Sequence, residues 1–244
     1  MKLFMTALTS ALALSAGSAF ATTALVSDLA AGSTLSEGKV TLSNLFFNDN
    51  SEPIAFPNDT TVDPSSITAE LGVLGNMAVL SFTTTQDLNL TSPNGFLEFA
   101  LGFELGATGA LVSEVQLGNG DLNASGDGLI EAVFEVQRGG FGPVFDEKIE
   151  IFEDPSGPTP SQKTDSASVP NFNSVFVDGE VEGEADFTGD TAGFSTFAFM
   201  FTFTNSVETP VIQPLTPQPV PLPAAGWMLL VGLGGLGLAR RRTS

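Results

Sequence analysis

Residues 195–204, STFAFMFTFT, place a Phe at every second position from Phe197 to Phe203. Successive side chains of a β-strand point to opposite faces, so the four Phe rings share one face while Thr, Ala and Met occupy the other. The segment is therefore predicted to be a strand whose aromatic face lies in the core.

Shorter stretches before this segment show similar patterns. Apolar residues alternate with Glu, Val and Gln over 130–137, and Gly139-Gly140 separates them from 148–152, which predicts a hairpin or a longer connection. Residues 78–85 and 96–105 are predicted as further strands, and residues 155–170 as a long exposed loop. Turn signals recur at Asn58-Asp59, Asn94-Gly95, Asn119-Gly120, Asp154-Pro155 and Asp178-Gly179.

Many short strands with frequent turns, and no long amphipathic helix, favour an all-β fold. We expect residues 22–208 to form a single β-sandwich domain, either jelly-roll-like or immunoglobulin-like. The segments on either side of this domain have a different composition and are interpreted below as targeting signals.

Charge is distributed unevenly along the 244 residues. The chain has 28 acidic and 8 basic residues and no His, which gives a net charge of −20. Four basic residues stand at the two ends of the chain: Lys2, Arg240, Arg241 and Arg242. The stretch between them is therefore strongly acidic and repels phosphate backbones, which argues against a nucleic-acid partner.

Cys, His and Tyr are absent from the sequence. Without Cys there are no disulfides, thiolate metal sites or cysteine nucleophiles, and without His no Ser-His-Asp triad can form. We therefore expect no enzyme activity. The only Trp, Trp227, lies near the C-terminus, so the domain lacks the Trp and Tyr rings that usually stack on sugars.

The N-terminus has the three parts of a secretory signal peptide. Lys2 supplies a positive charge, an apolar run follows from Leu3 to Ala16, and Ala19 and Ala21 flank Phe20 in an A-x-A cleavage site. The run is shorter than the roughly 20 apolar residues that span a bilayer. We interpret residues 1–21 as a signal peptide that is removed, so that the mature chain begins at Thr22.

The C-terminus combines a linker with a short apolar segment. Residues 209–223 are rich in Pro and are predicted to be an extended linker. Residues 224–239 carry no charge, and a helix of this length covers about 24 Å, slightly less than a hydrocarbon core of roughly 30 Å. Because Arg240, Arg241 and Arg242 follow, positive-inside bias places them in the cytoplasm and the acidic domain outside. Residues 224–244 are thus predicted to form a transmembrane helix with an Arg-rich end.

This tail resembles the PEP-CTERM class of bacterial sorting signals in its VPLPA variant. The residues that carry the resemblance are Val220, Pro221, Leu222, Pro223 and Ala224, the Gly-rich apolar segment 226–238, and Arg240, Arg241 and Arg242. Leu222 is a departure, because the founding pattern has Glu between the two prolines. The resemblance implies an exosortase-type membrane processing enzyme as partner, a temporary membrane anchor, and a link to exopolysaccharide or biofilm. An unprocessed C-terminal anchor is the alternative.

One loop has oxygen-bearing side chains at the spacing of a calcium loop. Asp121, Asn123, Ser125 and Asp127 alternate, with Gly126 at the sixth position, as a tight loop around Ca²⁺ requires. The bidentate Glu expected at the twelfth position is missing, because that position is Ala132. A polar turn between two strands is the favoured interpretation. We expect no cofactor apart from the calcium ion that this loop could hold, and if a cation binds, these four residues are its candidate ligands.

A second acidic feature is a row of carboxylates spaced by two: Asp178, Glu180, Glu182, Glu184 and Asp186. On an extended strand they would share one face. A solvated strand face is the favoured interpretation, and weak multivalent cation binding or an edge protected from aggregation are the alternatives. Two close carboxylates could also serve as the acid and base of a glycosidase.

These observations predict an exported bacterial protein of the cell surface or extracellular matrix, with a structural or adhesive role linked to exopolysaccharide. Its route would be export across the inner membrane, a transient membrane anchor, and then the cell surface or the medium. Two alternatives stay open: an extracellular carbohydrate-active enzyme that uses acidic residues, and a calcium-dependent binding module.

Overall fold

The segment 195–204 forms β14 (Thr196–Phe203), so the predicted strand is confirmed. In the computed structural model, residues 21–51, 59–91, 93–119, 121–139, 145–157 and 161–207 are described. β14 pairs antiparallel with β5 (Met77–Thr84) on one side and with β7 (Val112–Asn119) on the other. It therefore lies inside a sheet, where its Phe face and its Thr, Ala and Met face are separated by the sheet itself.

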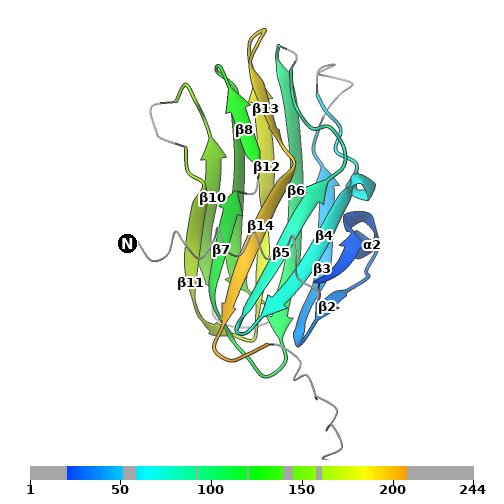
Figure 1. The fold of residues 1–244 in the computed structure, drawn as a ribbon, viewed down its shortest axis with the longest axis vertical. Helices are drawn as coiled ribbons and strands as arrows, with labels where there is room; N and C mark the ends of the chain where they lie inside the picture. Colours follow the sequence, from blue (N-terminus) through cyan, green and yellow to red (C-terminus); the bar gives the residue numbers. More distant parts are fainter. Residues whose placement is uncertain are drawn as a thin grey trace, which may run out of the picture. The chain divides into compact units, whose positions relative to one another are not determined.

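Two six-stranded antiparallel sheets form a sandwich, which confirms the predicted all-β class (Figure 1). Sheet A has the order β1 (Ala21–Leu25), β4 (Ile67–Leu74), β5, β14, β7, β11 (Thr164–Phe172). Sheet B has the order β10 (Asp146–Glu153), β9 (Leu129–Arg138), β12 (Ser174–Ala185), β6 (Gly95–Ala107), β3 (Val40–Asp49), β2 (Leu35–Glu37). β8 (Leu122–Ser125) and β13 (Thr191–Phe194) form a small third sheet near one end (Figure 1).

The core between the sheets is largely aromatic. Phe199 of β14 is fully buried, and its ring centroid lies 5.0 Å from that of Phe134 in β9 and 5.2 Å from that of Phe103 in β6. Both contacts are edge-to-face, the arrangement that aromatic quadrupoles favour. Because Phe134 and Phe103 belong to sheet B, these rings hold the two sheets together.

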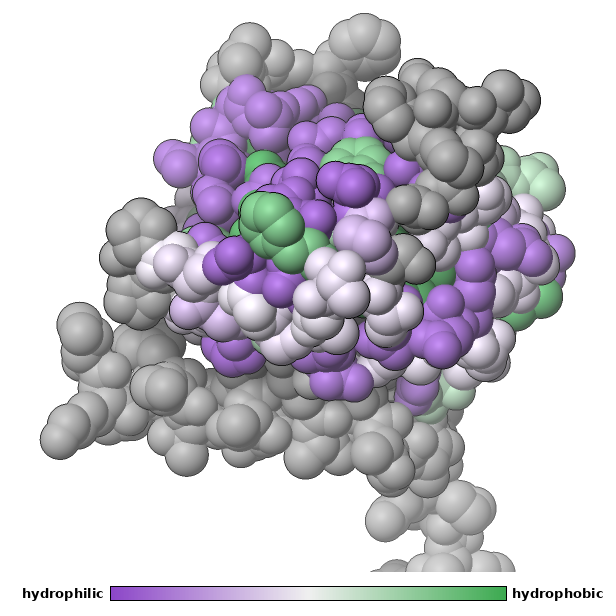
Figure 2. All heavy atoms as spheres, turned by 90° about the horizontal axis from the view of Figure 1, so that it is seen from above, coloured by the Kyte–Doolittle hydropathy of each residue, from purple (hydrophilic) through white to green (hydrophobic). Residues whose placement is uncertain are grey.

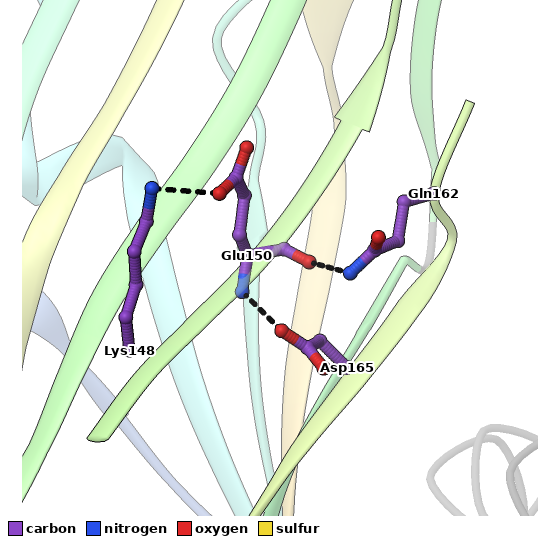
Figure 3. A network of polar contacts seen from close by, with 4 residues as sticks. All are labelled: Lys148, Glu150, Gln162 and Asp165. Atoms are coloured by element: carbon purple, nitrogen blue, oxygen red, sulfur yellow. Dashed lines mark hydrogen bonds and ion pairs between the residues drawn. The ribbon is translucent and has the colours of Figure 1, made fainter. Parts of the chain in front are cut away.

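The lateral edges of the sandwich are connected by side chains. The backbone N–H of Glu150 in the edge strand β10 donates to Oδ2 of Asp165 at 3.0 Å, and the backbone O of Glu150 accepts from Nε2 of Gln162 at 2.8 Å (Figure 3). On the opposite side, the Thr22 hydroxyl donates to the backbone O of Ser36 at 3.0 Å. These bonds occupy backbone groups that could otherwise pair with a strand of another chain.

Three local predictions are wrong. Asp178 and Gly179 lie inside β12 and form no turn. The predicted edge role of the carboxylate row fails as well, because β12 lies between β9 and β6 in the interior of sheet B. Residues 155–170 are not one loop, since β11 begins at Thr164. β11 accommodates Pro170 because it is an edge strand and its register shifts between Ser168 and Phe172.

The predicted targeting segments lie mostly outside the described residues. Ala19, the motif Val220 to Ala224 and the three terminal Arg residues all fall there, whereas Ala21 is the first residue of β1. In the described part of the chain, no helix is long and apolar enough to cross a bilayer. Its α-helix, α2 (Val26–Ala30), has five residues and buries Val26 and Leu29.

Candidate functional site

The four candidate calcium ligands lie along an extended strand and the turn after it. Asn123 and Ser125 belong to β8, Asp121 immediately precedes it, and Asp127 follows in a turn that Gly126 enters with φ of +66°. Two residues along a strand span about 6.6 Å, so Asp121, Asn123 and Ser125 are spread out along one exposed side. They are not wrapped around a point.

Two of these side chains already have protein partners. Oδ2 of Asp121 accepts from the Ser195 hydroxyl at 2.5 Å, and the Ser125 and Thr191 hydroxyl oxygens lie 2.7 Å apart. Within the described ranges, no three Asp, Glu, His or Cys side chains form a group that could hold a metal. Where Figure 2 shows described residues, the surface at this end is a mixture of hydrophilic residues and residues of intermediate hydropathy, with a few scattered hydrophobic ones. Calcium binding by the four residues stays a prediction.

The carboxylate row forms part of a larger acidic surface on the outward face of sheet B. Asp178, Glu180, Glu182 and Glu184 alternate along β12 with buried or inward residues, and Asp186 lies beyond the end of the strand. Glu182 is directly opposite Glu98 of β6 and Glu131 of β9. Three Glu side chains on three adjacent strands therefore stand in one row, with neighbouring Cβ atoms about 5 Å apart.

This crowding affects the acidity of the carboxyl groups. Partial burial, and then the charges of Glu131 and Glu98, raise the pKa of Glu182. Burial followed by the Glu150 charge raises the pKa of Glu131. Burial and the charges of Glu135 and Asp146 raise the pKa of Asp178, whose Oδ1 is buried without a hydrogen-bond partner. The anionic forms are therefore disfavoured on this face.

Lys148 offsets part of this charge at the edge of the sheet. Its Nζ lies 2.7 Å from a carboxylate oxygen of Glu150, on the same strand (Figure 3). Hydrogen bonding to Glu150, despite some desolvation, raises the pKa of Lys148. This ion pair is largely exposed, so it contributes little to stability.

Beside the carboxylate row, a bulge in β3 turns an aromatic ring outward. Asn44 has a positive φ of 52°, and the pairing of β3 with β6 shifts between Ser43 and Phe46. As a result Leu45 is buried and Phe46 is 41% exposed. The Phe46 ring lies over Gly102 of β6, where an added Cβ would come within 2.0 Å of Cε1 of the ring. Gly102 thus provides the space that Phe46 occupies.

Phe46 has an aromatic neighbour on the same face. Its ring centroid lies 6.4 Å from that of Phe176 in β12, with the planes 28° apart. Phe176 is directly opposite Glu104 of β6, two residues from Gly102 on the same outward side. The Phe46–Phe176 pair therefore adjoins Glu104.

Glu104 lies in an open groove of about 210 Å³ between the ends of β3, β6 and β12. The Ser174 hydroxyl donates to its Oε1 at 2.6 Å, and Nδ2 of Asn44 donates to its Oε2 at 2.9 Å. These two bonds fix the carboxylate in the groove. The side chains of Thr41, Ser43 and Thr108 add further polar groups to the lining.

Lys39 lines the same groove. Its Nζ donates to the backbone O of Ser206 at 3.2 Å, and its backbone is bonded to Val207 and Thr108. The groove thus combines a fixed carboxylate, several hydroxyl groups and a Lys side chain, and it adjoins the exposed Phe46 ring and the half-buried Phe176 ring. Such a combination can contact both the hydroxyl groups and the apolar face of a small ring.

Sequence reasoning missed this groove, although one signal for it was present. Phe46 and Phe47 are adjacent, and neighbouring residues of a regular strand cannot both face the core. Phe47 stacks on Phe99 at 5.3 Å in the core, which leaves Phe46 on the outside. Glu104, Asn44 and Ser174 gave no comparable signal, because only the pairing of β3, β6 and β12 brings them together.

Comparisons with known proteins give little further information. No family profile matches the chain, and no curated protein matches it. Among solved structures, the chain is similar to TmCBM61 in complex with β-1,4-galactotriose, with 13% sequence identity and a TM-score of 0.22 over 55% of this chain and 85% of that one. A likeness this weak says nothing about what the present chain binds.

Proposed function

We propose that this chain is an exported structural or adhesive protein of the bacterial surface or matrix, and that its β-sandwich attaches to an extracellular polysaccharide. The observation that carries the binding part is the groove in which Glu104 is held by Asn44 and Ser174 beside the exposed Phe46 ring. The export part rests on the signal-like N-terminus and the VPLPA-type tail of the sequence.

The groove has the two kinds of contact that a saccharide needs. A sugar ring has apolar C–H faces that pack on an aromatic side chain, and hydroxyl groups that require hydrogen-bond partners. Phe46 is supported from below by Gly102 and from the side by Phe176, so little ordering of the ring remains for binding. Both oxygens of Glu104 are likewise held before any ligand arrives, which lowers the entropic cost of binding.

The tail gives the proposal its cellular setting. In the proposed pathway, an exosortase-type membrane enzyme recognises Val220 to Ala224 and releases the domain from a temporary anchor formed by residues 224–244. The intact mass of the extracellular protein tests this step. A mass that corresponds to a chain without residues 1–21 and without the apolar tail agrees with the proposal, whereas a mass that includes Trp227 to Ser244 contradicts it.

Polysaccharide binding can be tested with the mature exported protein. We expect it to be retarded in native gels that contain exopolysaccharide from the producing strain, and Phe46→Ala and Glu104→Ala to abolish the retardation. Phe187→Ala is a matched control, because Phe187 is 61% exposed just beyond the other end of β12. If none of the matrix polysaccharides retards the protein, the proposal fails.

The same samples address the enzymatic alternative. A glycosidase would release reducing ends from the polysaccharide, and Glu131 and Glu182 would be the first pair to test because they are opposite each other and their pKa values are raised. We propose binding without hydrolysis, so we expect no reducing ends after prolonged incubation. Release that disappears in Glu182→Gln would favour the enzyme.

A further inference from the structure

We propose that the groove selects an amino-sugar unit, whose protonated amine pairs with Glu104 while a face of the sugar ring lies against Phe46. This inference rests on the proposed function, because it specifies which class of polysaccharide the groove takes. Three observations support it: the hydrogen bonds that hold Glu104, the position of Glu104 relative to Phe46, and the carboxylates that β12 carries on the same face.

Glu104 is held as a hydrogen-bond acceptor but its charge has no ion-pair partner in the described part of the chain. Its two donors, the Ser174 hydroxyl and the Asn44 amide, are both neutral. Each carboxylate oxygen can accept a second bond, so the group has acceptor capacity left on both sides. A ligand that brings an ammonium group would form a charge-assisted hydrogen bond there, which is stronger than one from a neutral hydroxyl.

Lys39 is the cation that lines the groove, and it is directed elsewhere. Its Nζ is bonded to the backbone O of Ser206. Lys39 therefore leaves the carboxylate of Glu104 available to a ligand.

The position of Phe46 sets the size of the ligand unit. Phe46 covers Gly102, and Glu104 follows two residues later on the same face of β6, about 6.6 Å along the strand. This separation suits a single sugar ring that stacks on Phe46 and directs one substituent toward Glu104. Phe176, opposite Glu104, closes the side of the site toward β12.

The rest of the face favours a cationic polymer over an anionic one. The β12 carboxylates Asp178, Glu180 and Glu182 follow Phe176 along the same outward side. Their field attracts positive groups and repels uronates, sulfates and phosphates. A polymer with an amine on successive units would reach these carboxylates after its first unit has bound, which adds avidity without a second groove.

The test compares three oligosaccharides of equal length by isothermal titration calorimetry with the mature protein at about pH 6. They are an oligomer of glucosamine, its N-acetylated form and an oligomer of galacturonic acid. We expect the glucosamine oligomer to bind at least about tenfold more tightly than the acetylated one, as a charge-assisted bond implies, and the galacturonate oligomer not to bind. Equal binding of the first two, or binding of galacturonate, would overturn the inference and leave the proposed function intact.

Variants separate the groove from general charge attraction. Glu104→Gln should remove the preference for the amine while binding of the acetylated oligomer persists, and Phe46→Leu should weaken both ligands alike. Glu70→Gln on sheet A is the matched control, since it removes the same charge far from the groove, and it should change nothing. If Glu104→Gln keeps the preference while added salt abolishes it, the oligomer adsorbs to the acidic face and the groove assignment is wrong. If no saccharide binds at all, the proposed function itself fails.

Discussion

β14 and β12 are interior strands of sheets A and B, and they differ in the side chains that they direct to the core and to the surface. β14 points Phe197, Phe199, Phe201 and Phe203 into the core and carries no charge. β12 points Val and Gly into the core and carries four carboxylates outward. β14 thus contributes large side chains to the core, whereas β12 contributes charged side chains to the surface.

The difference extends from the strands to their surroundings. Within sheet B, β12 has a small residue where the neighbouring strand comes close: a Cβ added at Gly179 would lie 2.6 Å from Cα of Phe134 in β9. On the outside, Met200 of β14 packs on Met77 and Val79, so the outward face of sheet A is apolar at this point, whereas β12 carries a row of carboxylates on the outward face of sheet B. Because the carboxylates of β12 alternate with its buried residues and point away from the core, a ligand can contact them without disturbing the core packing.

The largest expected effect comes from the aromatic side of this comparison. Phe199→Ala removes a fully buried ring that contacts both Phe103 and Phe134, and should lower the free energy of unfolding by about 3–5 kcal/mol. Thr202→Ala changes the outward face of the same strand and should cost no more than about 0.5 kcal/mol. Urea unfolding followed by far-UV circular dichroism measures both, because the described domain has no Trp or Tyr. Similar losses in the two variants would contradict the conclusion that the Phe face of β14 contributes more to stability than its outward face.

A smaller loss is expected at the inward face of β12. A Cβ at Gly179 would lie 2.0 Å from the backbone O of Val133, whereas a Cβ at Gly183 would meet only side-chain atoms, the nearest being Cδ1 of Ile130 at 3.0 Å. Backbone cannot move without opening the pairing of β12 with β9, so Gly179→Ala should cost about 1–3 kcal/mol. Gly183→Ala should cost less than half of that in the same unfolding experiment. The reverse order would show that the close contact at Gly179 does not limit the packing.

The sequence was sufficient for β14 and for the class of fold, but not for β12. Alternation of Phe with small residues has one physical interpretation, a strand with a core face, and it holds in the structure. Asp178-Gly179 has two interpretations, a turn or a strand in which Gly avoids a clash. The choice between them depends on Val133 and Phe134, which come from β9, so no local pattern could have made it.

The candidate site was less accessible to prediction than the fold. The shared face of Asp178, Glu180, Glu182 and Glu184 follows from their spacing and was predicted correctly. The row from Glu98 through Glu182 to Glu131 depends on the register of three strands. The groove around Glu104 depends in addition on the bulge at Asn44, a tertiary feature that composition and periodicity do not contain.

The connection between the two sheets at β10 should have an intermediate effect. Asp165→Ala leaves the backbone N–H of Glu150 without its acceptor, and we expect a loss of about 1–2 kcal/mol. It also frees part of the β10 edge, so the variant should self-associate more readily. Asp146→Ala, at the exposed start of the same strand, is the control. Urea unfolding and size-exclusion chromatography at several concentrations measure the two effects, and equal behaviour of both variants would contradict the role of Asp165.

Millimolar calcium should stabilise the domain by less than about 1 kcal/mol, because the acidic face is partly solvated and cations screen its self-repulsion. A specific site at β8 would add saturable binding that Asp121→Ala and Asp127→Ala abolish. Melting temperatures in calcium and in magnesium, for the parent and both variants, distinguish the two cases. Identical responses to the two ions, unchanged in the variants, would leave screening as the only effect and rule out the site at Asp121 to Asp127.

The smallest expected change is a gain in stability at the row of three Glu residues. Like charges directly opposite each other on neighbouring strands destabilise a sheet by about 0.2–1 kcal/mol, and Glu182 faces Glu98 and Glu131 at once. Glu182→Gln should therefore raise the free energy of unfolding at pH 7 by this amount. Glu180→Gln is the matched control, because Glu180 is opposite Val133 and Ala100 and should gain less.

The pH dependence of stability provides an independent measurement of the same row. The pKa values of Glu131, Glu182 and Asp178 are raised in the folded protein above ordinary values of 4.5 for Glu and 3.8 for Asp. In the window above those ordinary values the folded state holds more protons than the unfolded state, so the contribution of these groups falls as the pH rises through the raised pKa values. The melting temperature should therefore be higher at about pH 5 than at pH 8, and Glu182→Gln should reduce that difference while Glu180→Gln reduces it less. A parent protein whose melting temperature rises between pH 5 and pH 8 would show that the crowded carboxylates do not govern its stability. The outward face of β12 would then affect the free energy of unfolding no more than the outward face of β14 does.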